Sequence, residues 1–191
     1  LATIRPLALI AHAVVLSPSQ VKTLIPDSAS AHHPVLRPSD RIALMQADLV
    51  LRVGPAHDAF LDKLLSSRQK TTLTAQRLSE IQLLTARSLH EDSSSHAEHQ
   101  HSSATDPHLW LLPQNASVIA QALAQQLTKL DPANAAQYQQ RANRFSQRIQ
   151  ALNTQLHRST TTPYMAWHDA YQYLEPTLSL QFKGSLTLDA D

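Results

Sequence analysis

The sequence has no cysteine among its 191 residues, so it can form neither a disulfide bond nor a thiolate metal site. It has only two glycines, and no glycine-rich phosphate-binding loop occurs in it. Basic and acidic residues nearly cancel, at 16 and 15, so no strong field favours nucleic acid or a membrane surface. The longest apolar run, residues 7–16, is interrupted by His12 and is too short to span a bilayer.

The start of the chain lacks a positively charged segment followed by a long apolar stretch, and we expect no signal peptide in it. A secreted protein in its mature form would look the same, so this absence does not favour the cytoplasm. The length suits one good-sized domain or slightly more, and an apolar share of 42% is sufficient for an ordinary core.

Short apolar segments alternate with helical ones along most of the chain, which is typical of βαβ units in a parallel sheet. The predicted strands are residues 1–4, 22–25, 49–53, 71–75, 164–167 and 178–182. The predicted helices are residues 6–15, 59–65, 113–130 and 169–174, with another that starts at Pro38. We therefore predict an α/β fold with a parallel-sheet N-terminal lobe, a long spine helix and the start of a second α/β lobe.

The spine helix is the clearest structural signal. Asp131 and Pro132 supply a cap and a first-turn proline. Apolar residues then recur at spacings of four and three: Tyr138, Ala142, Phe145, Ile149, Leu152 and Leu156. A long coiled coil would fit this spacing, but fewer than four heptads favour a helix packed on the domain. The predicted division is residues 1–131, 132–158 and 159–191, the last being the beginning of an incomplete C-terminal lobe.

Eleven histidines are present, and three lie in separate, punctuated contexts. His32 lies in Ala-His-His-Pro-Val-Leu-Arg-Pro, His108 in Asp-Pro-His-Leu-Trp and His168 in Ala-Trp-His-Asp-Ala. Neutral imidazole is a common zinc ligand, and three protein ligands with one open position form a frequent zinc geometry. Because these residues flank predicted strand and helix ends, where open α/β sheets bind ligands, we expect them to converge on one metal ion. His33 is then expected to point away.

Residues 90–107 are rich in serine and histidine and have no apolar periodicity, which predicts a surface loop. The loop could be a solvated insertion, but its clustered histidines favour weak, exchangeable metal binding. These histidines are His90, His96, His99 and His101.

The other polar and aromatic candidates are assigned supporting roles. Asp106 and Asp169 neighbour two ligand candidates and are suited to hold an imidazole in place. The histidines on predicted helices are interpreted as structural or solvent-facing: His12, His57 and His157. The large aromatic residues are expected in the core: Trp110, Trp167 and Phe60.

Catalysis has little support in the sequence. There is no His-Glu-x-x-His run and no strand–turn–helix context that singles out a nucleophile. We predict that the chain is not an enzyme. A zinc hydrolase with a three-histidine site and an interaction domain with incidental histidines are the alternatives of a different class.

Several motifs in the same order and spacing resemble one known family. They are His-x-x-x-Leu-Arg-Pro-Ser-Asp from His32, Ala-Asp-Leu-Val from Ala47, Val-Gly-Pro from Val53, His-Leu-Trp-Leu from His108 and His-Asp-Ala-Tyr from His168. Together they resemble the metal-binding solute-binding proteins of bacterial ABC importers, in the zinc-uptake (ZnuA-type) branch of the cluster A-I family.

The resemblance implies a periplasmic protein that captures Zn²⁺ in a cleft between two lobes and delivers it to a membrane permease. It implies that His32, His108 and His168 are the ligands, and that the His-rich loop gathers zinc. Manganese relatives tend to carry a carboxylate at the third position, so a manganese or iron carrier is the alternative within the family. Ala31 stands where zinc relatives often have glutamate. The resemblance also implies that most of the second lobe is absent from this sequence, and we expect open strand edges there that would allow a dimer.

Overall fold

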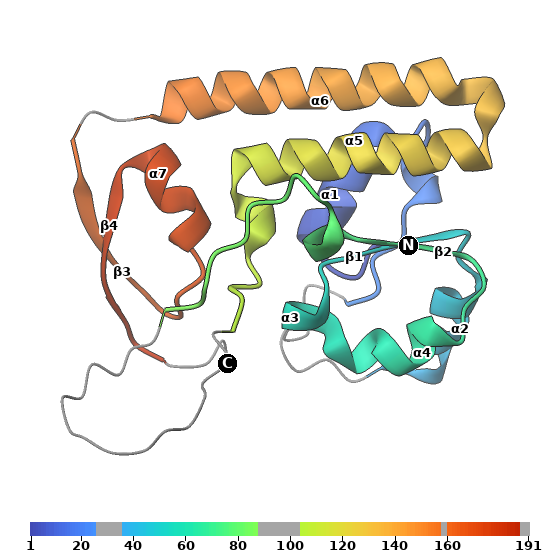
Figure 1. Ribbon diagram of the computed structural model, residues 1–191, viewed down its shortest axis with the longest axis horizontal. Coiled ribbons are helices and arrows are strands. Elements are labelled where there is room, and N and C mark those ends of the chain that lie inside the picture. Colours follow the sequence, from blue (N-terminus) through green and yellow to red (C-terminus); the bar gives the residue numbers. More distant parts are fainter. Residues whose placement is uncertain (26–35, 88–103, 158–159, 188–191) are drawn as a thin grey trace.

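The structure is a computed structural model that describes residues 1–25, 36–87, 104–157 and 160–187 (Figure 1). Its strands are β1 (Leu49–Arg52), β2 (Thr71–Thr74), β3 (Thr162–Ala166) and β4 (Leu180–Ser185). Its α-helices are α1 (Arg5–Val14), α2 (Pro38–Gln46), α3 (Pro55–Asp58), α4 (Asp62–Ser66), α5 (Pro113–Leu130), α6 (Ala135–Leu156) and α7 (Glu175–Leu178). Both strand pairs, β1–β2 and β3–β4, are parallel, and the predicted α/β fold class is confirmed.

The first sheet is extended by the N-terminal segment of the chain. Ala2 forms parallel bridges with both Thr23 and Leu51, so two short extended segments continue the β1–β2 pair. The strands predicted over residues 1–4 and 22–25 are therefore each reduced to a single bridged residue, Ala2 and Thr23. The first is short because α1 begins at Arg5, with a proline in its first turn.

A buried ion pair lies at the end of β1. Arg52 and Asp58 are 5% and 0% exposed, and Nε of Arg52 donates to Oδ1 of Asp58 at 2.7 Å. The backbone N–H groups of Val53 and Gly54 also donate to this carboxylate, at 3.0 and 3.1 Å, and Thr3 Oγ1 donates to it at 3.2 Å. The carboxylate thereby fixes the turn between β1 and α3.

The long helices α5 and α6 run side by side along the molecule (Figure 1). Ile119 and Leu123 of α5 are buried, and so are Tyr138 and Ala142 of α6. The predicted apolar stripe of α6 is buried only in its first half, since Leu156 is 36% exposed. Figure 1 shows the reason: α6 continues beyond the start of α5. No helix among the described residues is both long and apolar enough to cross a membrane.

The second sheet differs from the sequence prediction in its connection. The predicted helix over residues 169–174 is correct only in its second half: a 3₁₀ helix, η6 (Gln172–Leu174), leads into α7, which has a proline in its first turn. Ser179 adopts a left-handed conformation with φ of 51° and ends α7, so β4 begins at Leu180 rather than at residue 178. Tyr173 is 1% exposed and belongs to the main core, which joins this second sheet to the rest of the chain.

Candidate metal centre

His108 is held in place by the carboxylate of Asp106. The two residues are 7% and 3% exposed, and Nδ1 of His108 lies 2.8 Å from Oδ1 of Asp106. The backbone N–H of His108 donates to the same oxygen at 2.9 Å. An ionised carboxylate only accepts hydrogen bonds, so this contact places the ring proton on Nδ1 and the lone pair on Nε2. This is the arrangement in which a histidine binds a metal through Nε2 while a carboxylate orients its ring.

His168, in the loop that follows β3, lies beside His108. Their ring centroids are 5.4 Å apart, with an angle of 38° between the ring planes. Burial lowers the pKa of His168, and the nearby His108 lowers it further, although Asp169 and Asp106 oppose this shift. The neutral, metal-binding form of His168 is therefore favoured over the imidazolium.

Trp110 contacts two histidines. Its ring meets His108 edge-on at a centroid distance of 5.5 Å and His57 at 5.8 Å. His57 lies on α3 and is only 8% exposed, so of its two predicted roles the structural one is correct. Trp110 packs against the core as expected, whereas Trp167 and Phe60 are 61% and 39% exposed, contrary to prediction.

Two antiparallel segments, which we call the arms, lead into the metal centre: residues 84–87 and 104–106. A bridge between Thr85 and Thr105 joins them, together with a 2.7 Å hydrogen bond from the Ala86 N–H to the Ala104 carbonyl. Tyr173 ties both arms to the second sheet. Its hydroxyl accepts from the Leu84 N–H at 2.8 Å and donates to the Asp106 carbonyl at 3.2 Å.

Arg87 forms a second tie between the arms and the second sheet. Its Nε and Nη2 donate to the two carboxylate oxygens of Asp169 at 2.7 and 2.9 Å, and Nη2 also donates to Glu175 at 2.7 Å. Asp169 was expected to orient the His168 ring, but both of its oxygens instead accept from Arg87. Partial burial lowers the pKa of Arg87, yet the hydrogen bonds that it donates to Glu175 and Asp169 outweigh this effect and raise its pKa.

The predicted ligands divide into those that the structure places and those that it does not. It brings His108 and His168 together. His32 and His33, and the loop residues His90, His96, His99 and His101, lie outside the described residues. Within the part of the chain that is described, no group of three or more histidines or carboxylates is close enough to hold a metal. No pattern in the sequence points to Arg87 or Tyr173, because their roles depend on partners more than 60 residues away.

Solved structures of metal-binding solute-binding proteins share this fold. A crystal structure of ZnuA superimposes with a TM-score of 0.78 at 20% identity, over 96% of this chain and 67% of that one. Zn(II)-bound AdcA from Streptococcus pneumoniae gives 0.78 at 18% identity, over 98% and 39%. FpvC from Pseudomonas aeruginosa in complex with Mn²⁺ gives 0.78 at 22% identity, over 98% and 67%. The fold is thus that of a solute-binding protein.

The whole of residues 1–191 matches the family of ZnuA, the periplasmic component A of the zinc-uptake complex, and the chain belongs to this family. The high-affinity zinc uptake system protein ZnuA of Yersinia pestis is 32% identical over 208 residues, covering 99% of this chain. The ZnuA of Brucella abortus strain 2308 is 27% identical over 226 residues, also covering 99%. The chain spans 65% and 67% of these two relatives' lengths. Members of the family are solute-binding proteins of ABC importers and not enzymes.

Proposed function

We propose that this chain is the zinc-binding part of a periplasmic solute-binding protein, which captures Zn²⁺ and delivers it to the permease of an ABC importer. The pairing of His108 with His168 is the observation that carries the proposal. With Zn–N bonds of about 2.0–2.1 Å, two imidazoles on one tetrahedral zinc ion have ring centroids about 5 Å apart. The observed centroid distance of 5.4 Å matches this value.

His32 is proposed as the third ligand, and water or a carboxylate as the fourth. The proposed site lies between residues 1–131, which carry His108, and residues 159–191, which carry His168, with residues 132–158 as the connecting spine. His90, His96, His99 and His101 are proposed to bind further zinc more weakly, because the serine- and histidine-rich sequence around them predicts a surface loop. A dimer through open sheet edges has no support among the relatives and is not part of the proposal.

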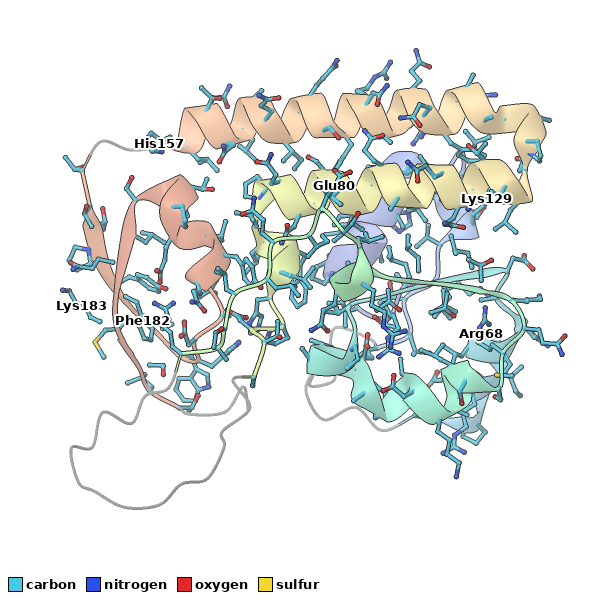
Figure 2. The ribbon with its side chains drawn as sticks, in the orientation of Figure 1. Arg68, Glu80, Lys129, His157, Phe182 and Lys183 are labelled. Atoms are coloured by element: carbon cyan, nitrogen blue, oxygen red, sulfur yellow. The ribbon has the colours of Figure 1, made fainter. Side chains whose placement is uncertain are left out.

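Titration of the chain with zinc, with a chromophoric chelator as competitor, tests this function. The wild-type chain is expected to bind one tight equivalent, and His108→Ala is expected to lose it. Deletion of residues 91–103, which keeps both arms, should remove weak equivalents and leave the tight one. His157→Ala is the matched control, since His157 lies exposed at the end of α6 (Figure 2). An unchanged tight site in His108→Ala would refute the ligand assignment.

Competition between metals separates zinc from the manganese and iron alternatives. A site built from imidazoles favours zinc over manganese by the general order of divalent metal affinities. We therefore expect a small excess of zinc to displace manganese from the tight site, and a large excess of manganese to leave bound zinc in place. Displacement of zinc by equimolar manganese would assign the chain to manganese transport instead.

A further inference from the structure

Arg87 contacts three side chains of the C-terminal part of the chain. Its guanidinium forms a two-pronged ion pair with Asp169, shares Nη2 with Glu175 and stacks on the ring of Phe182 at 4.2 Å. These contacts reach the loop after β3, the start of α7 and strand β4. Figure 2 marks Phe182 on β4, beside the segment of the first arm. The Arg87 side chain thus holds the loop after β3, helix α7 and strand β4 against the first arm, residues 84–87.

The charge balance at this cluster depends on Arg87. Asp169 and Glu175 both accept from the same nitrogen, Nη2, so their carboxylates face each other across it. Glu175 also accepts a 2.7 Å hydrogen bond from the hydroxyl of Tyr164. Without the guanidinium, two carboxylates would lie close together and repel each other. The loop that contains Asp169 would then be expected to move away from α7.

That loop contains His168, which immediately precedes Asp169. The start of the loop is held at the Trp167 carbonyl, which accepts from the N–H groups of Leu186 and Thr187 and from the Thr187 hydroxyl. After His168, Arg87 holds Asp169, and the Ala170 N–H donates to the His168 carbonyl within the loop. The opposite ligand candidate, His108, is held independently by Asp106. A shift of Asp169 would therefore change the distance between the two imidazoles rather than move both together.

We propose that Arg87 is a positioning residue of the metal site, which holds His168 at its working distance from His108 by clamping Asp169. This inference rests on the proposed function, since it assigns His168 to the zinc site. The contact between Arg87 and Asp169 is separate from the packing of the second sheet on the rest of the chain. Tyr173 lies in the main core and donates to the Asp106 carbonyl, and these contacts do not involve Arg87. Loss of the clamp is thus expected to weaken zinc binding much more than it weakens the fold.

A double-mutant cycle in the 191-residue chain tests the clamp. Arg87→Gln and Asp169→Asn are each expected to weaken the tight zinc site by about tenfold or more, the usual cost of losing a residue that orients a ligand. The double variant should be no weaker than about the worse single variant, because both changes break the same contact. Arg87→Lys keeps the charge without the paired N–H donors and should lose less affinity than Arg87→Gln.

The matched control is Lys70→Gln, which breaks a 2.9 Å ion pair with Asp48 on the surface of the first sheet, close in length to the 2.7 Å pair of Arg87 and Asp169. It should leave zinc affinity within about twofold of wild type. A wild-type affinity in both Arg87→Gln and Asp169→Asn would overturn the proposal. Equal losses in the Lys70 control would also overturn it, because the effect would then be a general one.

A readout without metal separates this inference from the proposed function. The chain has two tryptophans: Trp167 precedes His168, and Trp110 contacts His108. In the metal-free chain labelled with 5-fluorotryptophan, Arg87→Gln should shift or broaden the fluorine line of Trp167 and leave that of Trp110. If the wild-type chain had no tight zinc site, the proposed function would fail. These spectra would then test by themselves whether Arg87 positions the loop that contains His168. An unchanged Trp167 line would overturn it.

Discussion

A single carboxylate oxygen, Oδ1 of Asp106, holds His108 at two points, the backbone N–H and the ring nitrogen Nδ1. The other oxygen, Oδ2, is within 3.0 Å of the side-chain amide of Gln172 when that amide is oriented to donate. Both oxygens of this buried carboxylate are thus engaged, and the His108 ring has one preferred orientation and tautomer.

Asp106→Asn is expected to weaken tight zinc binding by about 10- to 100-fold. The change removes the negative charge that favours a proton on Nδ1, and with it part of the basicity of Nε2. Chelator competition with zinc measures the effect. Asp131→Asn is the control. The carboxylate of Asp131 likewise accepts two hydrogen bonds, from Tyr138 and Asn134, but it lies at the end of α5 that is far from His108. Equal affinities for Asp106→Asn and wild type would show that the carboxylate does not tune the ligand.

Zinc affinity is expected to fall as the pH drops below about 6.5, the ordinary pKa of histidine. Only neutral imidazole binds zinc, so each ligand that takes up a proton competes with the metal. The lowered pKa of His168 keeps this residue neutral further into the acidic range than an ordinary histidine. The loss should therefore steepen at lower pH, where His168 is protonated. Affinities measured from pH 7.5 to 5.0 check this, and a flat profile would contradict imidazole ligation.

Asp58→Asn is expected to lower the free energy of unfolding by about 3 kcal/mol, because it leaves the buried charge of Arg52 with only the half-exposed carboxylate of Asp62 as an ion-pair partner. Asp48→Asn is the matched control. Its carboxylate pairs with Lys70, but its side chain is 81% exposed, and such pairs contribute at most about 1 kcal/mol. Urea unfolding followed by circular dichroism compares the two variants. Similar losses in both would mean that burial does not set the importance of the Arg52–Asp58 pair.

Gly54→Ala is expected to destabilise the turn after β1 more than Gly184→Ala destabilises β4. Both glycines have positive φ, 141° and 153°, so both substitutions cost backbone strain, roughly 1–3 kcal/mol each. A Cβ at Gly54 would also lie 2.7 Å from Cβ of Gln76, whereas at Gly184 the nearest atom is 4.0 Å away. Thermal unfolding of the two variants gives the comparison, and equal shifts would show that the contact with Gln76 relaxes freely.

The sequence predicted the helices and strands best where a local pattern of residues is sufficient to define them. Strands β1 and β2 and helix α5 lie within about a residue of their predicted positions, because apolar patterns and prolines mark their limits. The helix predicted over residues 169–174 begins late, at Gln172, for a tertiary reason. Asp169 is engaged by Arg87 from a distant arm, and helical structure begins only after this contact. Trp167 is a large apolar residue of the kind expected in a core, but it is exposed. Only the packing around β3 determines this position.

The candidate site divides in the same way. The sequence by itself determined that any metal would be bound through nitrogen and oxygen, because there is no cysteine, and it singled out His108 and His168 by their places beside strand and helix ends. Only the tertiary structure decided that these two rings lie 5.4 Å apart, and that Asp106, Tyr173 and Arg87 hold the segments that carry them. Ligand chemistry belongs to single residues and can be recognised in sequence, whereas the distance between ligands depends on long-range contacts that form only in the folded chain.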